Sequence, residues 1–421
     1  MRRVVVNGRF FAQPRTGVQR YGVETLVALD RLLGRAPQLL EGTAWQLALP
    51  RDADDVPLLE HFEIHTLPQL TGHAWEQLSL AAFARGAYLV NASYSAPLFK
   101  RRQCITVHDA SVRAHPQTFS RGYRWFNNLA MSLLAPRVDT LMTVSRFSAR
   151  ELRTHFHLKR DDVIVARSGW EHAVAPSAVD DATVLARHGL RPGGYLFAVG
   201  SLKANKNFGL VPRALQLLGA ELPLPMAVAG GRDAWVFQGI EPLGRDTVRL
   251  LGYVSDAELY ALYRHAAWFV FPSVYEGFGL PPLEAMANGC PVLAAQAASI
   301  PEIYGDAVVY FDPHDPASLA ATLRAVTTHP DATALREQLR RRGAARLSYY
   351  TWEANAQILL DRLIAVGAAA RAPTAQAAVW MRAPSNVFIS CLKTCPSTPP
   401  SKFSAGTSKP SKEMSYSFMP R

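Results

Sequence analysis

The sequence predicts two doubly wound α/β domains, each built on a parallel β-sheet. Its 421 residues exceed the length of about 250 to 300 residues at which a single hydrophobic core stops growing. Short apolar segments alternate with helical stretches in two separate series along the chain, which is the pattern of repeated βαβ units. We therefore expect two cores joined by a linker.

Each series contains short apolar segments that are predicted to be strands. The first series comprises residues 4–7, 45–49, 88–91, 104–108, 140–144 and 163–166, and the second comprises residues 195–200, 226–229, 248–251, 267–271, 291–294 and 308–311. Residues 169–181 contain Pro176 and little periodicity, which is typical of a linker. The predicted domains are residues 1–172 and 173–351.

Capping signals mark the helix ends. Ser255 and Glu258 stand three residues apart, as in a capping box, and predict a helix through His265. Pro282 suits the first turn of the next helix, and Gly289 suits its end. A last helix, within residues 352–370, is predicted to complete the N-terminal domain.

Composition limits the class of protein. Hydrophobic residues make up 49% and charged residues 19% of the chain, as in globular proteins. The four cysteines form neither a disulfide framework nor a zinc motif, so we expect a cytoplasmic protein. No apolar run suggests a membrane span, and residues 1–6 predict a strand rather than a signal peptide. Residues 372–421, rich in Pro, Ser, Thr and Lys, predict a disordered basic tail.

The net charge of +11 lies in the N-terminal half and in the tail. Patches such as Lys100-Arg101-Arg102 could attract a phosphate-bearing acceptor or an anionic membrane surface. Peripheral contact with the inner membrane through the N-terminal domain is therefore one expectation, and ordinary solvated charge is the other. No basic run is interleaved with aromatic residues, so we expect no nucleic-acid partner.

The strongest functional signal is the segment YEGFGLPPLE at residues 275–284. It follows a predicted strand, and ligands of open α/β sheets bind beyond the carboxyl ends of strands. Glu276 and Glu284 lie on either side of a loop whose glycines allow backbone N–H groups to face phosphates. The loop candidates are Phe278, Gly279 and Leu280. Glu284 is expected in the first turn of the following helix.

This E-x7-E element resembles that of retaining glycosyltransferases of the GT-B fold, in family four of the glycosyltransferase classification. The resemblance covers roughly residues 1–370 and implies two Rossmann-like domains whose parallel sheets face each other across a cleft. It implies that Glu276 contacts the transferred sugar and that Glu284 binds the ribose hydroxyls of a nucleotide diphosphate sugar. It also implies that neither a metal nor a cofactor is needed.

The segment GSLKANKN at residues 200–207 resembles the pyrophosphate loop of the same family. A cation there would offset the charge that builds on the departing diphosphate. Lys206 is predicted to supply that charge, because a Lys-Asn pair before the helix is the family pattern. Ser201 stands in the substrate-binding loop where the family often has an arginine, and Lys203 could replace the missing charge.

Three further segments resemble parts of the family's substrate site. The nucleotide base is expected beside Tyr253 and Val254, although a buried tyrosine at a strand end would serve packing equally well. Gly17 lies in a shortened form of the first glycine loop and would approach the donor diphosphate, or it marks a plain turn. Ser168 replaces an asparagine that relatives usually carry at the domain junction.

His108 is the best polar candidate on the acceptor side. It ends a predicted strand in the segment TVHD at residues 106–109, and the resemblance implies that it reaches the transferred sugar. The alternative is a structural histidine held by Asp109. Arg146 follows the next strand and could approach an acceptor phosphate.

Together these residues predict a retaining, metal-independent transfer of a hexosyl group, mannose by analogy, to a saccharide or lipid-linked saccharide acceptor in cell-surface polysaccharide synthesis. A nucleotide-sugar 2-epimerase of related fold and a non-catalytic scaffold protein stay open as alternatives. A nicotinamide-linked dehydrogenase is disfavoured because no G-x-G-x-x-G is present. Asp52-Ala53-Asp54 matches the Asp-x-Asp of metal-dependent transferases only in its letters.

Overall fold

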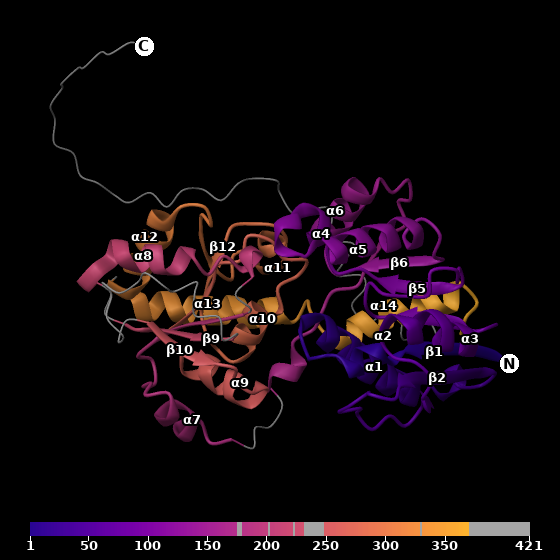
Figure 1. Cartoon of the computed structure of the whole chain (residues 1–421). Helices are drawn as coiled ribbons and strands as arrows, with labels where there is room; N and C mark the ends of the chain where they lie inside the picture. The colour runs from indigo at the N-terminus through magenta and orange to yellow at the C-terminus, as the bar shows by residue number, and fades with distance from the viewer. Residues whose placement is uncertain (175–178, 201–202, 222–223, 231–247, 329–330, 370–421) are drawn as a thin grey trace, which may run out of the picture. The chain divides into compact units, whose positions relative to one another are not determined.

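The computed structural model describes residues 1–174, 179–200, 203–221, 224–230, 248–328 and 331–369 (Figure 1). Within these residues the chain forms two parallel sheets with helices packed against them. The predicted α/β fold class with two parallel-sheet domains is confirmed. The predicted boundary within residues 169–181 stays a prediction, and the predicted tail lies outside the described residues.

The first sheet has seven strands in the order β3-β2-β1-β4-β5-β6-β7. They are β1 (Arg2–Asn7), β2 (Thr43–Pro50), β3 (Glu63–Leu67), β4 (Tyr88–Asn91), β5 (Gln103–Thr106), β6 (Thr140–Thr143) and β7 (Ile164–Val165). Sequence analysis missed β3 because this edge strand is largely exposed and lacks an apolar face. The strand predicted at residues 104–108 ends at Thr106, so His108 lies beyond it.

The second sheet has six strands in the order β10-β9-β8-β11-β12-β13. They are β8 (Leu196–Val199), β9 (Met226–Ala229), β10 (Val248–Gly252), β11 (Trp268–Phe271), β12 (Val292–Ala295) and β13 (Val309–Phe311). Tyr263 packs edge-on against Phe197 and Phe269, at centroid distances of 5.3 and 5.1 Å, and all three side chains are buried. Each predicted strand of this series is confirmed to within a residue or two.

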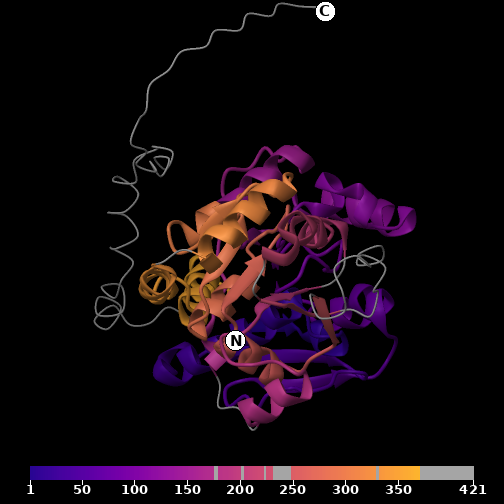
Figure 2. The ribbon, with the colours of Figure 1, turned by 90° about the vertical axis from the view of Figure 1, so that its left-hand side faces the viewer.

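The helices pack on these sheets. They are α1 (Gly17–Arg35), α2 (Gly72–Ala74), α3 (Ala81–Phe83), α4 (Ser111–Ala114), α5 (Arg121–Leu134), α6 (Arg146–Phe156), α7 (Asp181–Arg187), α8 (Leu210–Leu218), α9 (Asp256–His265), α10 (Leu280–Ala287), α11 (Ile300–Tyr304), α12 (Pro316–Thr328), α13 (Ala332–Leu347) and α14 (Trp352–Ala365). α10 packs on β11 and β12, and α12 packs on β13; these helices are drawn in salmon to orange in Figure 2. Among the described residues, no helix is both long and apolar enough to cross a membrane.

Short tight helices complete the list of elements. Those used below are the 3₁₀ segments η1 (Gly8–Ala12), η5 (Glu171–Val174) and η6 (Ala204–Lys206), and the π-helical segment η3 (Trp75–Leu80). The others are η2 (Pro37–Leu39), η4 (Pro116–Thr118) and η7 (Gly219–Glu221).

The predicted helix ends are largely confirmed. Ser255 and Glu258 form the predicted capping box, in which each side chain accepts the other residue's backbone N–H at 2.9 to 3.3 Å. One prediction is wrong: Glu284 is the fifth residue of α10 and lies beyond its first turn, because the helix begins at Leu280. The last helix ends at Ala365, within the predicted range, and Gly367 just beyond it adopts a left-handed φ of 66°.

α14 packs along α1 of the first domain, and Asn355 is the polar centre of that contact. Its amide nitrogen donates to the Tyr21 hydroxyl at 3.0 Å and to the Arg167 carbonyl at 2.8 Å. Its amide oxygen accepts from the Thr25 hydroxyl at 2.9 Å, and the side chain is 1% exposed. These bonds join the end of the described chain to its beginning.

We expect Asn355→Ala to lower the free energy of unfolding by about 2 to 3 kcal/mol, because it leaves buried donors and acceptors without partners. Urea unfolding followed by circular dichroism would measure this. Gln357→Ala, which removes only a surface bond to Asp361 on the same helix, is the control. Equal stability of the two variants would contradict the prediction.

Candidate active site

Lys206 and Glu276 lie in direct contact although they come from two different loops. Lys206 ends η6 after β8, and Glu276 follows β11. The strand order of the second sheet reverses between β8 and β11, which is where open α/β sheets bind ligands. Lys206 Nζ lies 2.6 Å from Glu276 Oε1, and the two side chains are 25% and 11% exposed. The structure thus brings two of the three predicted catalytic residues together.

Backbone contacts hold these two loops in place. The Val274 N–H donates to the Asn205 carbonyl at 2.9 Å, and the Asn205 amide donates to the Tyr275 carbonyl at 3.3 Å. Lys203 lies 6.0 Å from the Phe119 ring. Ser201, predicted to bind substrate in the same loop, lies outside the described residues.

The loop after Glu276 touches the segment that carries His108. A Cβ atom on Gly277 would lie 2.1 Å from the His108 carbonyl oxygen, so no side chain fits there. The Ser145 hydroxyl donates to the Gly277 carbonyl at 2.6 Å, and the Ser148 hydroxyl lies 2.9 Å from the His108 carbonyl oxygen. This glycine is required for the close approach of two backbones.

His108 is half-buried and held by a backbone carbonyl. Its Nε2 lies 3.1 Å from the Ala92 carbonyl oxygen, which can only accept, so Nε2 carries the proton. The ring packs edge-on against Tyr21 at 4.8 Å. The Asp109 carboxylate accepts from the Ser111 N–H, and among the described residues the ring is hydrogen-bonded to the Ala92 carbonyl rather than to Asp109. Burial lowers the pKa of His108, and the Ala92 carbonyl and Asp109 only partly oppose this effect.

Glu284 lies on α10 with both carboxylate oxygens engaged. Oε1 is 3.1 Å from His172 Nε2, and Oε2 is 3.4 Å from the Tyr263 hydroxyl. At the start of the helix, Gly279 adopts a left-handed φ of 85°. Phe278 packs on Tyr350 with a centroid distance of 5.6 Å.

The other residues predicted near the substrate range from fully buried to exposed. Leu280 lies next to Gly17, since a Cβ atom on Gly17 would be 3.6 Å from the Leu280 side chain. Tyr253 is 87% exposed, so the alternative of a buried packing residue is wrong, and Val254 beside it is half-buried. Ser168 is buried.

Arg146 begins α6, and an internal carboxylate occupies that end of the helix. The backbone N–H groups of Arg146 and Phe147 donate to Glu302 of α11 at 2.9 and 2.8 Å. The Arg146 side chain, 58% exposed, also lies 3.5 Å from Glu302. An acceptor phosphate at this position would compete with Glu302.

Comparison with known proteins identifies the family of the chain. The family model described as Glycosyl transferases group 1 matches residues 188–346. The O-antigen chain mannosyltransferase B of Escherichia coli is 31% identical over 259 residues, which are 60% of this chain and 67% of that protein. The chain belongs to the glycosyl transferases group 1 family.

Other comparisons set the extent of the similarity. The serotype-specific mannosyltransferase WbdA of Escherichia coli is 28% identical over 248 residues, but the match spans only 30% of its length. The solved sucrose-phosphate synthase of Thermosynechococcus elongatus covers 87% of this glycosyltransferase and 100% of its own chain, with a TM-score of 0.67 and 18% identity. The GT-B fold is therefore shared.

His172 of η5 is a site residue that sequence analysis missed in this glycosyltransferase. Its Nδ1 lies 3.0 Å from Nε1 of Trp352, and an indole nitrogen can only donate. Nδ1 must therefore accept, and Nε2 carries the proton that is donated to Glu284. No sequence signal marks His172, because its two partners lie 112 and 180 residues away.

Arg20 is a second such residue, and it borders a cavity of about 600 Å³. Burial alone would lower the pKa of Arg20, but Tyr260, Asp256 and Glu284 together raise it. The guanidinium on α1 is hydrogen-bonded to Asp256 on α9. Because His172, Tyr260 and Trp352 also line this cavity, it adjoins the partners of Glu284.

We expect stability to fall below pH 6.5, because His108 binds a proton less tightly in the folded than in the unfolded chain. The stabilisation is present above the ordinary pKa of 6.5 and is lost as the pH falls below it, by up to about 1.4 kcal/mol per pH unit. Thermal unfolding of the wild type, His108→Gln and the exposed-site control His314→Gln between pH 7.5 and 5 measures this. His108→Gln should flatten the slope and the control should not; the same slope in all three would contradict the prediction.

Proposed function

We propose that the chain transfers a mannosyl group from a nucleotide diphosphate sugar to a saccharide or lipid-linked saccharide acceptor, with retention at the anomeric carbon, in the synthesis of cell-surface polysaccharide. The Lys206–Glu276 ion pair at the point where the second sheet reverses carries the proposal. Similarity to proteins named mannosyltransferases supports the choice of sugar. It does not favour the alternatives, an epimerase or a non-catalytic scaffold.

The proposed reaction needs no protein nucleophile and no metal or other cofactor. The acceptor hydroxyl oxygen bonds to the anomeric carbon while the bond from that carbon to the diphosphate oxygen breaks on the same face. The hydroxyl proton passes to the departing diphosphate oxygen. The protein then acts by positioning the two substrates and stabilising charge.

Each predicted site residue that the structure describes has a role in this proposal, whereas Ser201 lies outside the described residues. Lys206 offsets the charge that grows on the diphosphate, and Glu276 and His108 orient the transferred sugar. Glu284 binds the ribose. Backbone groups are proposed to contact the phosphates and the base; they belong to Gly17, Tyr253, Val254, Phe278, Gly279 and Leu280.

A cytoplasmic location with peripheral contact to the inner membrane is part of the proposal. Helix α5 exposes Trp125, which is 69% exposed, together with Tyr123 and Phe126. On the same helix Arg121 is exposed and Arg124 is half-buried. Aromatic and basic side chains together suit an anionic lipid surface, which is where a lipid-linked acceptor would lie.

One series of nucleotide diphosphates should raise the melting temperature of the full chain in the presence of EDTA. A ligand at 100 times its Kd adds about 2.7 kcal/mol of stability. Differential scanning fluorimetry against GDP, UDP, ADP, TDP and their sugar derivatives measures this. The shift should be lost in Glu284→Ala and kept in the surface control Glu337→Ala. No shift with any nucleotide would sink the proposal.

Lys206→Ala should lower kcat about 10²- to 10³-fold with a smaller effect on donor KM, because the charge that Lys206 offsets grows mainly in the transition state. Release of nucleotide diphosphate from the donor that stabilises the protein measures this. Lys159→Ala, at an exposed site in the first domain, is the control. Full turnover by Lys206→Ala would show that the charge assignment is wrong.

His172→Phe should weaken donor binding about tenfold while leaving kcat nearly unchanged, because Glu284 loses the proton donor that holds its carboxylate. His172→Gln, which can still donate to Glu284, should recover part of the affinity. Isothermal titration of the donor and steady-state kinetics measure the two effects. His265→Gln, which alters a pair with Asp181 on α7, is the control. Unchanged donor affinity in His172→Phe would contradict the assigned role.

A further inference from the structure

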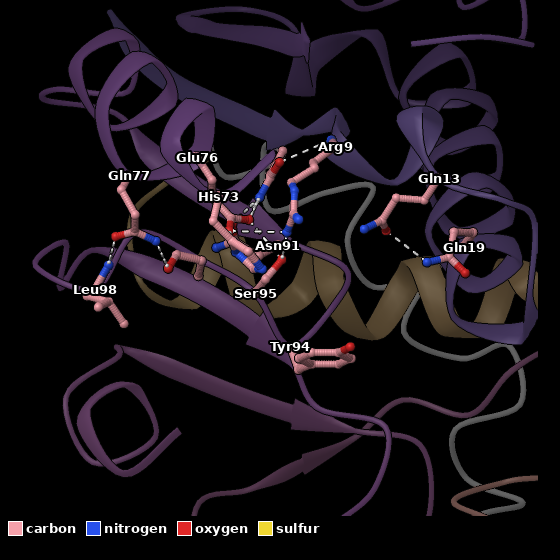
Figure 3. A network of polar contacts seen from close by, with 12 residues as sticks. Arg9, Gln13, Gln19, His73, Glu76, Gln77, Asn91, Tyr94, Ser95 and Leu98 are labelled. Atoms are coloured by element: carbon pink, nitrogen blue, oxygen red, sulfur yellow. Dashed lines mark hydrogen bonds and ion pairs between the residues drawn. The ribbon is translucent and has the colours of Figure 1, made fainter. Parts of the chain in front are cut away.

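A fully buried carboxylate lies where the strand order of the first sheet reverses. That reversal falls between β1 and β4, and open α/β sheets bind ligands beyond the strand ends that flank such a point. Asn7 ends β1 and Asn91 ends β4. The Asn7 amide donates to Glu76 and to Asn91, at 2.9 Å each, and Glu76 is 0% exposed. Figure 3 shows Glu76 at the centre of this network.

The buried carboxylate of Glu76 holds Arg9. Glu76 Oε2 lies 3.4 Å from Arg9 Nη1 and 3.4 Å from His73 Nδ1, and Oε1 accepts from the Ser95 hydroxyl at 2.9 Å. Nη1 of Arg9 also donates to the Ser95 oxygen at 2.9 Å. One edge of the guanidinium is therefore fixed by two partners (Figure 3).

The other edge of the guanidinium is available. Within the part of the chain that the structure describes, Nε and Nη2 of Arg9 have no hydrogen-bond partner. Neither atom is among the buried polar atoms without a partner, so both reach solvent, and the Arg9 side chain is 14% exposed. Two donors of a planar fork are thus presented in a fixed orientation.

A purely structural account of this network is weak. Burying a carboxylate and a guanidinium costs desolvation that their attraction often fails to repay. Glu76 also lies on the π-helical segment η3, and π-helical turns are frequent at functional sites. A role that accounts for the network is to hold the Arg9 guanidinium in a fixed orientation.

The network adjoins the candidate active site and is flanked by aromatic rings. Ala92, next to Asn91, provides the carbonyl that holds His108. The His73 ring lies 4.8 Å from the Phe126 ring of α5, and the Tyr94 hydroxyl is paired with that of Tyr123. A few fixed polar groups among aromatic side chains are typical of small-molecule sites.

We propose that Arg9 and His73 bind hydroxyl groups of a neutral saccharide acceptor, with Glu76 and Ser95 as positioning residues for Arg9. This proposal rests on the proposed function and names the acceptor class. Glu76 offsets the positive charge of Arg9, so the site offers directed donors with little net charge. Such a site suits a neutral polyol better than a phosphate, which would need an uncompensated cation.

Binding of defined glycosides to the full chain tests this proposal. The probes are p-nitrophenyl α-D-mannoside, α-D-glucoside and N-acetyl-β-D-glucosaminide, followed by saturation-transfer NMR, with inorganic phosphate as competitor. At least one glycoside should bind the wild type, Arg9→Gln should weaken it about tenfold or more, and phosphate should not displace it. Arg15→Gln, which removes only a surface pair with Asp55, should bind normally. No glycoside binding by the wild type, equal binding by Arg9→Gln, or displacement by phosphate would each overturn the proposal.

Glu76→Gln tests the positioning role, and Ser95→Ala is the milder variant in case Glu76→Gln does not fold. Both should weaken glycoside binding while nucleotide-induced stabilisation stays at the wild-type value, a split that general loss of structure would not produce. Glycoside affinity unchanged in the folded variant would refute the role. Arg9-dependent glycoside binding without any nucleotide binding would remove the proposed function and leave this site standing. If nucleotides bind but glycoside binding does not depend on Arg9, the proposed function stands and the assignment of the Arg9 site is removed.

Discussion

The close approach of Gly277 to the His108 carbonyl is the constraint on which the site depends. It places the loop that carries Glu276 against the segment that carries His108, with no space for a side chain between them. The Ser145 hydroxyl fixes the same loop by its bond to the Gly277 carbonyl. Tyr275, just before the loop, is buried against Phe147 and His115. Residues of both sheets therefore meet around one glycine.

Each of the two sheets has one point where its strand order reverses, and a different kind of ion pair lies at each point. Where the second sheet reverses, the loops present a cation and an anion that are partly exposed, Lys206 and Glu276. Where the first sheet reverses, the carboxylate of Glu76 is fully buried, and its partners Arg9 and His73 reach the surface with 14% and 47% of their side chains exposed. An ion pair that reaches solvent can exchange partners when a charged ligand arrives, whereas a carboxylate without contact to solvent mainly fixes geometry.

The sequence was sufficient for the features that are local. Apolar segments bounded by turns predicted all strands except β3, whose exposed side chains give no apolar pattern. The motifs around Lys206 and Glu276 predicted two residues that do meet, because each motif follows a strand and the strands are neighbours. The position of Glu284 within α10 was wrong by one turn, because a proline can stand at several places in a first turn.

Site residues whose contacts lie far away along the chain could not be predicted from the sequence. His172 and Glu76 carry no motif, and Arg20 lies in the segment of Gly17 without a role that the segment predicts. Each matters through contacts with residues far along the chain. The hydrogen bond from His108 to the Ala92 carbonyl could not be predicted either, because the neighbouring Asp109 is the partner that the sequence suggests. Tyr253 shows the same limit, because a tyrosine at a strand end can be buried or exposed.

The carboxylate of Glu302 makes the N-terminal ends of α6 and α10 different in charge. It fills the N-terminal amides of α6, and the positive end of that helix is already neutralised from within. α10 differs: Gly279 gives it no side-chain cap, and no acidic residue lies in its first turn. Of these two helix ends, the chain itself places a carboxylate on that of α6 and none in the first turn of α10, where Pro281 and Pro282 lack a backbone N–H and Gly279, Leu280 and Leu283 carry one.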